Sequence, residues 1–303
     1  MCRLYALRAN EATKVECTLA HSQNALMLQS RSDLAGRAHS DGWGIAFYHG
    51  SQPEVEKRAS AAYRDLHFSG TAERIYARTV IAHVRLATVG TPRVENSHPF
   101  EFGHWVFAHN GTVTGFDVLK DEMERETLPK LQATRYGETD SEQFFLWLLS
   151  RLKGAGVEVS QAVSDVARAG DVIAESISDL SRRCRAADPE SQPKLNIVLT
   201  NGATMFATRW NNSLHYVVRR GLMDCEICGV PHVHHEVGND YRAIVVASEP
   251  ISDEAWERIP NHSVMTIDSS IHMRLSPIAD GHRHLSTPES LLSPATHYGD
   301  ATR

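Results

Sequence analysis

The sequence predicts an α+β fold, in which strands and helices occupy different stretches of one chain. Strand-like runs dominate the sequence up to Gly111, two helical patterns occupy the middle, and strand-like runs return from Leu195. The 303 residues, 42% of them hydrophobic and 22% charged, suffice for a sizeable core in an ordinary globular protein. Because we find neither an internal repeat nor a long linker, residues 2–275 are expected to form one domain.

Composition and charge argue against several classes of partner. The net charge of −6 and the isoelectric point near 6.3 give no reason to expect nucleic acid or an anionic membrane as a partner. No apolar run approaches the roughly 18 residues of a membrane span, and the N-terminus lacks the apolar stretch of a signal peptide. Five cysteines, an odd number, argue against a disulfide framework and for a reducing compartment. We therefore expect a cytoplasmic protein.

The first segments are predicted as a strand, a partly helical stretch and a second strand. Residues 4–7 alternate in the manner of a short strand, and residues 13–30 are expected to be helical in part, with Cys17 as a buried small residue. The strand-like run that follows contains Gly42 and Gly44. Such glycines indicate either the close approach of another backbone or a ligand, or only a turn that enters a core strand.

The next two strands are expected to carry polar side chains near their ends. A helix at Ser69–Ala77 leads into the β-branched run Thr79–Thr88, which contains Arg85. Trp105–Ala108 is the following strand, and it delivers His109-Asn110-Gly111 at its end. An Asn-Gly pair after a strand commonly marks only a turn.

Two helices and a second group of strands follow. Thr139 is a good N-cap with Glu142 three residues later, and Asp140 lies in the first turn, where the helix dipole favours a carboxylate. The apolar stripe of the second helix runs from Val159 to Leu180. Five strands are expected after it, at Asn196–Thr200, Thr204–Trp210, His215–Arg219, Tyr241–Ala247 and Val264–Asp268. Residues 276–303, rich in His, Ser and Pro, are expected to form a flexible C-terminal tail.

Cys2 is a candidate nucleophile because it follows the initiator methionine directly. Its side chain is small enough for that methionine to be removed, which would leave Cys2 with a free α-amine. That amine, with a pKa of about 7.7–8.0 against about 8.5 for a thiol, can accept the thiol proton near neutral pH. A cysteine near the start of a chain is often inert, so this observation gains weight only from the motifs that follow.

Several polar motifs gain meaning when they are taken together and in order. Besides Cys2, they are Asp41-Gly42-Trp43-Gly44, His83-Val84-Arg85-Leu86-Ala87-Thr88, Asn96-Ser97-His98-Pro99, His109-Asn110-Gly111 and Glu138-Thr139-Asp140. In this combination the sequence resembles the class II glutamine amidotransferases, which are N-terminal-nucleophile hydrolases. The Asp-Gly-Trp-Gly motif is most similar to small stand-alone members, such as the ergothioneine-pathway amidohydrolase and the glutathione-degrading amidotransferase-like proteins. The resemblance implies an αββα sandwich of two antiparallel sheets between helix layers.

The resemblance also implies catalytic roles. Cys2 would attack the carbonyl carbon of a γ-glutamyl amide and form a thioester, while its α-amine takes and returns the proton. The Asn110 side-chain amide and the Gly111 backbone N–H would stabilise the oxyanion. Some larger members place an arginine just before the glycine–aspartate region to steady the nucleophile. Here Ala38-His39-Ser40 takes that place, and the sequence leaves open whether Arg37 substitutes.

Four further residues are expected to bind the glutamyl group. Arg85 suits the α-carboxylate, because its planar fork binds a carboxylate through two hydrogen bonds. Asp140 suits the α-ammonium, although a helix-start charge explains it equally well. Thr88 and His98 are expected, by the same resemblance, to line the glutamyl pocket.

A second motif combines thiols and imidazoles. Cys225 and Cys228 form a Cys-x-x-Cys pair, and His232 and His234 follow closely. This set could bind a structural zinc ion, although the histidine spacing is tighter than in the usual zinc finger. The alternative is a polar loop with reduced, idle thiols. No cofactor is expected to be required for the amide chemistry itself.

The leading functional hypothesis is a stand-alone hydrolase of γ-glutamyl amides, since the family fold takes up nearly the whole chain. A second hypothesis is a glutaminase subunit that supplies ammonia to a separate synthase partner. A third is a non-catalytic, zinc-stabilised binding module of the same fold. A small-molecule γ-glutamyl substrate is the expected partner, with a synthase subunit or a homo-oligomer as further alternatives.

Overall fold

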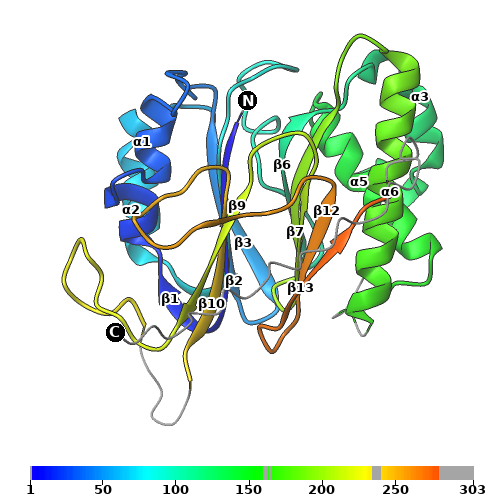
Figure 1. Ribbon diagram of the computed structural model, residues 1–303. Coiled ribbons are helices and arrows are strands. Elements are labelled where there is room, and N and C mark those ends of the chain that lie inside the picture. Colours follow the sequence, from blue (N-terminus) through cyan, green and yellow to red (C-terminus); the bar gives the residue numbers. More distant parts are fainter. Residues whose placement is uncertain (1, 160–162, 164, 234–239, 280–303) are drawn as a thin grey trace, which may run out of the picture.

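Two antiparallel sheets pack face to face, and helices cover the outer face of each sheet (Figure 1). The computed structural model describes residues 2–159, 163, 165–233 and 240–279. Within these residues the layers follow the order helix, sheet, sheet, helix, which confirms the predicted αββα sandwich.

The first sheet has β1 at its centre. Its strand order in the described part of the chain is β11-β9-β10-β1-β4-β2-β3, and Tyr5 of β1 lies opposite both Ala247 of β10 and Ala82 of β4. The strands are β1 (Arg3–Lys14), β2 (Trp43–His49), β3 (Gln52–Arg58), β4 (Tyr76–Val84), β9 (His215–Arg220), β10 (Arg242–Ala247) and β11 (Glu257–Arg258). β1 is therefore longer than the predicted residues 4–7, and its start is fixed by neighbours on both sides.

The second sheet carries the Asn-Gly motif inside a strand. Its order, over the residues described, is β13-β12-β8-β7-β6-β5. The strands are β5 (Phe100–Phe102), β6 (Trp105–Thr112), β7 (Lys194–Thr200), β8 (Met205–Arg209), β12 (Ser263–Ile267) and β13 (Met273–Pro277). Asn110 and Gly111 pair with Asn196 and Leu195 of β7, so the motif continues the strand and does not form a turn. The expected boundary at residue 275 falls inside β13.

The helices form two separate layers (Figure 1). The layer on the first sheet consists of a π-turn at Cys17–His21, α1 (Leu26–Arg31), a 3₁₀ turn at Ala62–Arg64 and α2 (Leu66–Arg74). The layer on the second sheet consists of α3 (Phe116–Glu126), α4 (Pro129–Gln132), α5 (Asp140–Gly154) and α6 (Val166–Ala187). The Thr139 hydroxyl accepts a hydrogen bond from the Glu142 N–H at 3.2 Å, as the predicted N-cap requires. No helix in the described ranges is long and apolar enough to cross a membrane.

β1 is buried on both faces, because it lies between the helices on one side and the second sheet on the other. Tyr5 and Leu7 belong to the apolar cluster between the first sheet and its helices. Leu4 and Ala6 belong to the cluster between the two sheets. Because successive strand residues face opposite sides, the alternation at residues 4–7 supplies both layers. The chain therefore presents Cys2 at the rim of the sandwich, held by the strand that follows it.

Candidate active site

Cys2 lies at the start of β1, where the chain enters the first sheet. Its side chain is buried, with 9% exposed, and its Sγ accepts a hydrogen bond from the Leu86 N–H at 3.4 Å. Burial raises the pKa of the Cys2 thiol, while the contact with Leu86 and the positive charge of Arg85 act in the opposite direction. A thiol in this position needs a nearby base to become a nucleophile at neutral pH.

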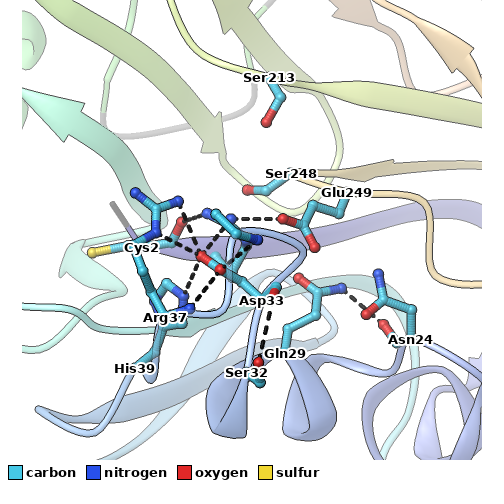
Figure 2. A network of polar contacts seen from close by, with 12 residues as sticks. Cys2, Asn24, Gln29, Ser32, Asp33, Arg37, His39, Ser213, Ser248 and Glu249 are labelled. Atoms are coloured by element: carbon cyan, nitrogen blue, oxygen red, sulfur yellow. Dashed lines mark hydrogen bonds and ion pairs between the residues drawn. The ribbon is translucent and has the colours of Figure 1, made fainter.

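A buried ionic cluster fixes the backbone next to Cys2. Arg3 Nη1 donates to the Cys2 carbonyl oxygen at 2.9 Å, and Arg3 Nη2 lies 2.6 Å from a carboxylate oxygen of both Asp33 and Glu249. Figure 2 shows His39 near Asp33, which its Nε2 approaches to 3.1 Å. Four chain segments thus converge on the peptide that carries the nucleophile.

The cluster answers the question that the sequence left open about Arg37. Arg37 Nε donates to Asp33 Oδ2 at 3.0 Å (Figure 2). Its link to Cys2 therefore passes through Asp33 and Arg3. Although burial favours a neutral carboxyl, hydrogen bonds from Arg37 and His39 and the Arg3 charge hold the pKa of Asp33 well below its usual range. Sequence reasoning missed Arg3, Asp33 and Glu249, because no local pattern shows that they meet.

Asn110 is joined to β1 through one hydroxyl group. Its Nδ2 donates to Ser248 Oγ at 2.8 Å, and the same oxygen accepts a hydrogen bond from the Leu4 N–H at 3.0 Å. The backbone carbonyl of Asn110 accepts from Asn212 Nδ2 at 3.1 Å. An amide NH₂ group carries two donors, so one hydrogen remains for another acceptor while Ser248 fixes the orientation.

Gly111 occupies a position that excludes any larger residue. A Cβ atom built there would lie 1.7 Å from the Lys194 carbonyl oxygen and 2.6 Å from His109 Nε2. His109 is buried and makes two contacts of 2.9 Å, with Ser141 Oγ and with the Lys194 carbonyl. β6 and β7 can therefore approach closely only because residue 111 has no side chain.

Arg85 is buried and contacts the loop that follows β4. Its Nη1 and Nη2 atoms donate to the carbonyl oxygens of residues 89–91 at 2.7–3.2 Å. Burial lowers the pKa of Arg85, and the nearby acidic groups of Cys2 and Asp140 oppose this change. The structure therefore brings Arg85, Cys2 and Asp140 within electrostatic range of one another, with loop carbonyls already on the guanidinium.

Asp140 opens α5 and faces the end of β6. Its Oδ2 accepts a hydrogen bond from the Val113 N–H at 2.8 Å, and its Oδ1 accepts one from the Ser141 hydroxyl at 3.2 Å. Only 4% of the side chain is exposed. Burial is the largest influence on the pKa of the Cys2 thiol, and the negative charge of Asp140 raises that pKa by a smaller amount. Asp140 thus links the second sheet, the helix layer and the surroundings of the nucleophile.

The two remaining predicted pocket residues differ in their surroundings. Thr88 is exposed on the loop after β4. His98 is buried, with its ring 4.2 Å from that of His83 and 4.6 Å from that of Phe100. Burial holds the pKa of His98 well below its usual range, so the ring is neutral at pH 7.

The predicted metal ligands lie at the other end of β1. Cys225, Cys228 and His232 lie close together, and Cys17 joins them, with all four ligand atoms within 4.8 Å of one another. The fourth predicted ligand, His234, lies outside the described residues. Sequence reasoning treated Cys17 only as a buried small residue; its burial holds, with 4% exposed, but its thiol also contributes to this group.

Comparison with known proteins gives consistent matches over most of the chain. The family model of class II glutamine amidotransferases matches residues 1–286. The probable glutamine amidotransferase DUG3 of Saccharomyces cerevisiae is 26% identical over 92% of this chain and 85% of its own length. A γ-glutamyl-hercynylcysteine sulfoxide hydrolase of Mycobacterium tuberculosis is also 26% identical, over 78% of this chain and 79% of its own. A solved glutamine aminotransferase class-II domain protein from Silicibacter pomeroyi shares the fold, with a TM-score of 0.60 and 20% identity over 92% of this chain and 100% of that chain.

Proposed function

The chain belongs to the class II glutamine amidotransferases, and we propose that it hydrolyses the γ-amide bond of a γ-glutamyl compound with Cys2 as the nucleophile. The observation that carries this proposal is that β1 holds the Cys2 thiol close to two opposite charges and is itself joined to Asn110. Cys2 at the start of β1 lies within electrostatic range of Arg85 after β4 and Asp140 of α5, and Ser248 joins the same strand to Asn110 of β6.

The first chemical step needs a base, because burial raises the pKa of the Cys2 thiol. Removal of the initiator methionine would supply that base as the α-amine of Cys2 itself. The amine takes the thiol proton, and the thiolate sulfur bonds to the γ-carbonyl carbon. The proton then passes to the leaving nitrogen as the C–N bond breaks. Water then hydrolyses the resulting thioester, and this step releases glutamate and regenerates the Cys2 thiol.

The tetrahedral intermediate carries a negative oxygen that requires fixed donors. The Asn110 amide is suited to this role. Its NH₂ group donates one hydrogen bond to Ser248 Oγ, and this contact orients the second N–H. The Gly111 N–H is proposed as the second donor. Both groups are fixed before the reaction begins, which is the condition under which such donors stabilise a transition state.

The glutamyl group is proposed to bind between Arg85 and Asp140. Arg85 would hold the α-carboxylate and Asp140 the α-ammonium, so that a zwitterion meets two buried charges of opposite sign. Without substrate, the Arg85 guanidinium donates hydrogen bonds to carbonyl oxygens of residues 89–91. The substrate carboxylate would therefore have to share the guanidinium with these acceptors or replace them. Thr88, on the same loop, and His98 are proposed to border the pocket.

The names of the relatives support two classes of substrate. One curated relative is named a γ-glutamyl-hercynylcysteine sulfoxide hydrolase, which supports a γ-glutamyl conjugate of a cysteine derivative as the substrate class here. Another is named a probable glutamine amidotransferase, which keeps ammonia transfer to a partner protein as the second candidate. The two differ in one observable, because a stand-alone hydrolase needs no second protein to reach full turnover.

The test is a panel of γ-glutamyl substrates assayed for glutamate release with wild-type protein, Cys2→Ala and Cys184→Ala. Cys184 is a buried cysteine of α6 with 0% exposed, so it serves as a matched control for loss of a thiol. We expect hydrolysis of at least one γ-glutamyl amide by wild type and Cys184→Ala, and none by Cys2→Ala. Hydrolysis by Cys2→Ala at the wild-type rate would refute the proposal.

A further inference from the structure

Three cysteines and one histidine meet at the end of β1 that lies opposite Cys2. Cys17 begins the π-turn that follows β1, whereas Cys225, Cys228 and His232 come from residues 221–233, which we call the knuckle segment. The four ligand atoms all lie within 4.8 Å of one another, and Cys228 Sγ is 3.2 Å from His232 Nε2. A tetrahedral zinc ion with Zn–S bonds of about 2.3 Å places its sulfur ligands roughly 3.8 Å apart, so the observed spread fits one ion.

The knuckle segment is shaped as a tight turn around the two sulfurs. The Gly229 N–H donates to the Cys225 carbonyl at 2.8 Å, and the Cys225 N–H donates to the Val230 carbonyl at 3.1 Å. The Ile227 N–H points at Cys225 Sγ from 3.4 Å, which is the contact that a thiolate ligand favours. Gly229 has φ +72°, a conformation that residues with a side chain rarely adopt. The backbone therefore presents both thiols to one point.

His232 and Cys17 are both held by the part of the protein around the end of β1. The Lys14 N–H donates to the His232 carbonyl at 2.7 Å, and Thr13 forms a β-bridge with Val233, so the knuckle segment is attached to the end of β1. Cys17 follows three residues later and is buried beneath the segment, with 4% exposed. A metal ion bound here would connect two parts of the chain that are far apart in sequence.

The knuckle segment has little apolar burial of its own. Four of its larger hydrophobic side chains are exposed, among them Met223 at 74% and Val230 at 55%, and only Val233 packs partly against the apolar cluster of the first sheet. A segment that buries so little apolar surface requires another source of stability, and a metal ion is a common one in short irregular segments. A disulfide could use only two of the three thiols and would leave the imidazole without a role.

We propose that Cys17, Cys225, Cys228 and His232 bind one structural zinc ion. Three thiolates and an imidazole form a closed tetrahedral set that leaves no position for a water molecule or a substrate. Binding releases the protons of the three thiols to solvent and leaves the imidazole neutral. The site differs from the set expected from the sequence, because Cys17 takes the place assigned to His234. It is separated from Cys2 by the length of β1, so it acts on the stability of the knuckle segment and not on the amide chemistry (Figure 1).

The test is the zinc content per chain of the full-length protein, measured by elemental mass spectrometry. This readout does not depend on enzyme activity. We expect about one zinc per chain in the wild type, and none in Cys17→Ala or Cys228→Ala. Cys184→Ala, which removes a buried thiol on α6, and His234→Ala should both keep the ion. Retention of a full equivalent by Cys17→Ala, or its loss from His234→Ala, would overturn the assignment of Cys17.

A second measurement on wild-type protein covers the case in which the cysteine variants fail to fold. The ion is removed with a chelator under reducing conditions, and the protein is titrated with Co²⁺ alone. We expect saturation at one equivalent, the intense visible bands of tetrahedral cobalt and a thiolate charge-transfer band, with a melting temperature on the order of 10 °C below the zinc form before metal is restored. Absence of a tetrahedral cobalt spectrum under these conditions would overturn the proposal.

Discussion

The Arg3 guanidinium lies 2.6 Å from the Asp33 carboxylate, and neither side chain is exposed by more than 4%. The same guanidinium donates to the backbone carbonyl of Cys2, so this ion pair fixes the position of the nucleophile. We expect Asp33→Asn to lower the free energy of unfolding by about 3 kcal/mol, because the buried Arg3 charge loses one of its two carboxylate partners and keeps only Glu249. Chemical denaturation measures the loss. Arg37→Ala removes a more exposed partner of Asp33 and should cost clearly less; an equal cost would contradict the central role of Arg3.

His39 should make stability depend on pH in a defined window. Burial is the main reason that the pKa of His39 falls from about 6.5 to about 4 in the folded protein. Between these two pH values the unfolded chain binds more protons than the folded one. The stabilising contribution of neutral His39 is therefore complete above pH 6.5 and is lost as the pH falls towards 4. The contribution is on the order of 3 kcal/mol. We expect His39→Gln to flatten this part of the curve of unfolding free energy against pH; an unchanged slope would show that His39 does not titrate there.

Asn110 and Ser248 should affect turnover to different degrees. Asn110→Ala removes a proposed oxyanion donor and should lower kcat by about 10²–10³-fold with little change in KM. Ser248→Ala leaves the donor in place but removes the hydroxyl that orients it, and should lower kcat by about tenfold. Steady-state kinetics on one γ-glutamyl substrate checks both. Wild-type kcat in Asn110→Ala would remove the amide from the mechanism.

Arg85 should act mainly on substrate capture. Lysine keeps the charge but cannot reproduce a planar two-point contact with a carboxylate, so Arg85→Lys should raise KM about tenfold or more and change kcat less. The substitution also removes hydrogen bonds to residues 89–91, and a melting curve separates that structural effect from binding. A substrate analogue without its α-carboxylate provides the control, because wild type and variant should handle it equally. Unaltered KM for the intact substrate in Arg85→Lys would assign the carboxylate to another residue.

Gly111 should not tolerate even one added carbon. A Cβ there would meet the Lys194 carbonyl oxygen at 1.7 Å, so Gly111→Ala must push β6 and β7 apart and should destabilise the protein by about 3 kcal/mol or more. Gly70 is exposed inside α2, and a Cβ added to it would meet no atom within 4 Å. Gly70→Ala should therefore stabilise the protein by up to about 1 kcal/mol. Melting temperatures of the two variants provide the comparison. Equal stability of both would contradict the close approach of the strands.

Local patterns predicted most of the elements, and long-range pairing explains what they missed. The cap at Thr139 and the strand at Asn196–Thr200 depend on neighbouring residues, and both occur where expected. The Asn110-Gly111 pair has the signature of a turn, but β7 supplies a partner strand and extends β6 through it. The tertiary partner overrides the local preference there.

The polar clusters were harder to predict, because their members come from distant parts of the chain. Asp33 and Glu249 meet only through Arg3, and no spacing in the sequence relates them. Cys17 likewise joins Cys225 only because β1 ends beside the knuckle segment. Cys2 could be predicted as a nucleophile because the family motifs keep their order along the chain even when their members are far apart.

The central claim is that the α-amine and the thiol of Cys2 act together, and one polypeptide assayed before and after cleavage tests it most directly. Met1 is replaced by an extension that a specific protease removes immediately before Cys2, and intact mass verifies each state. We predict no γ-glutamyl hydrolysis while the extension blocks the amine, and full activity once cleavage exposes Cys2. Equal turnover by the uncleaved protein would contradict the account.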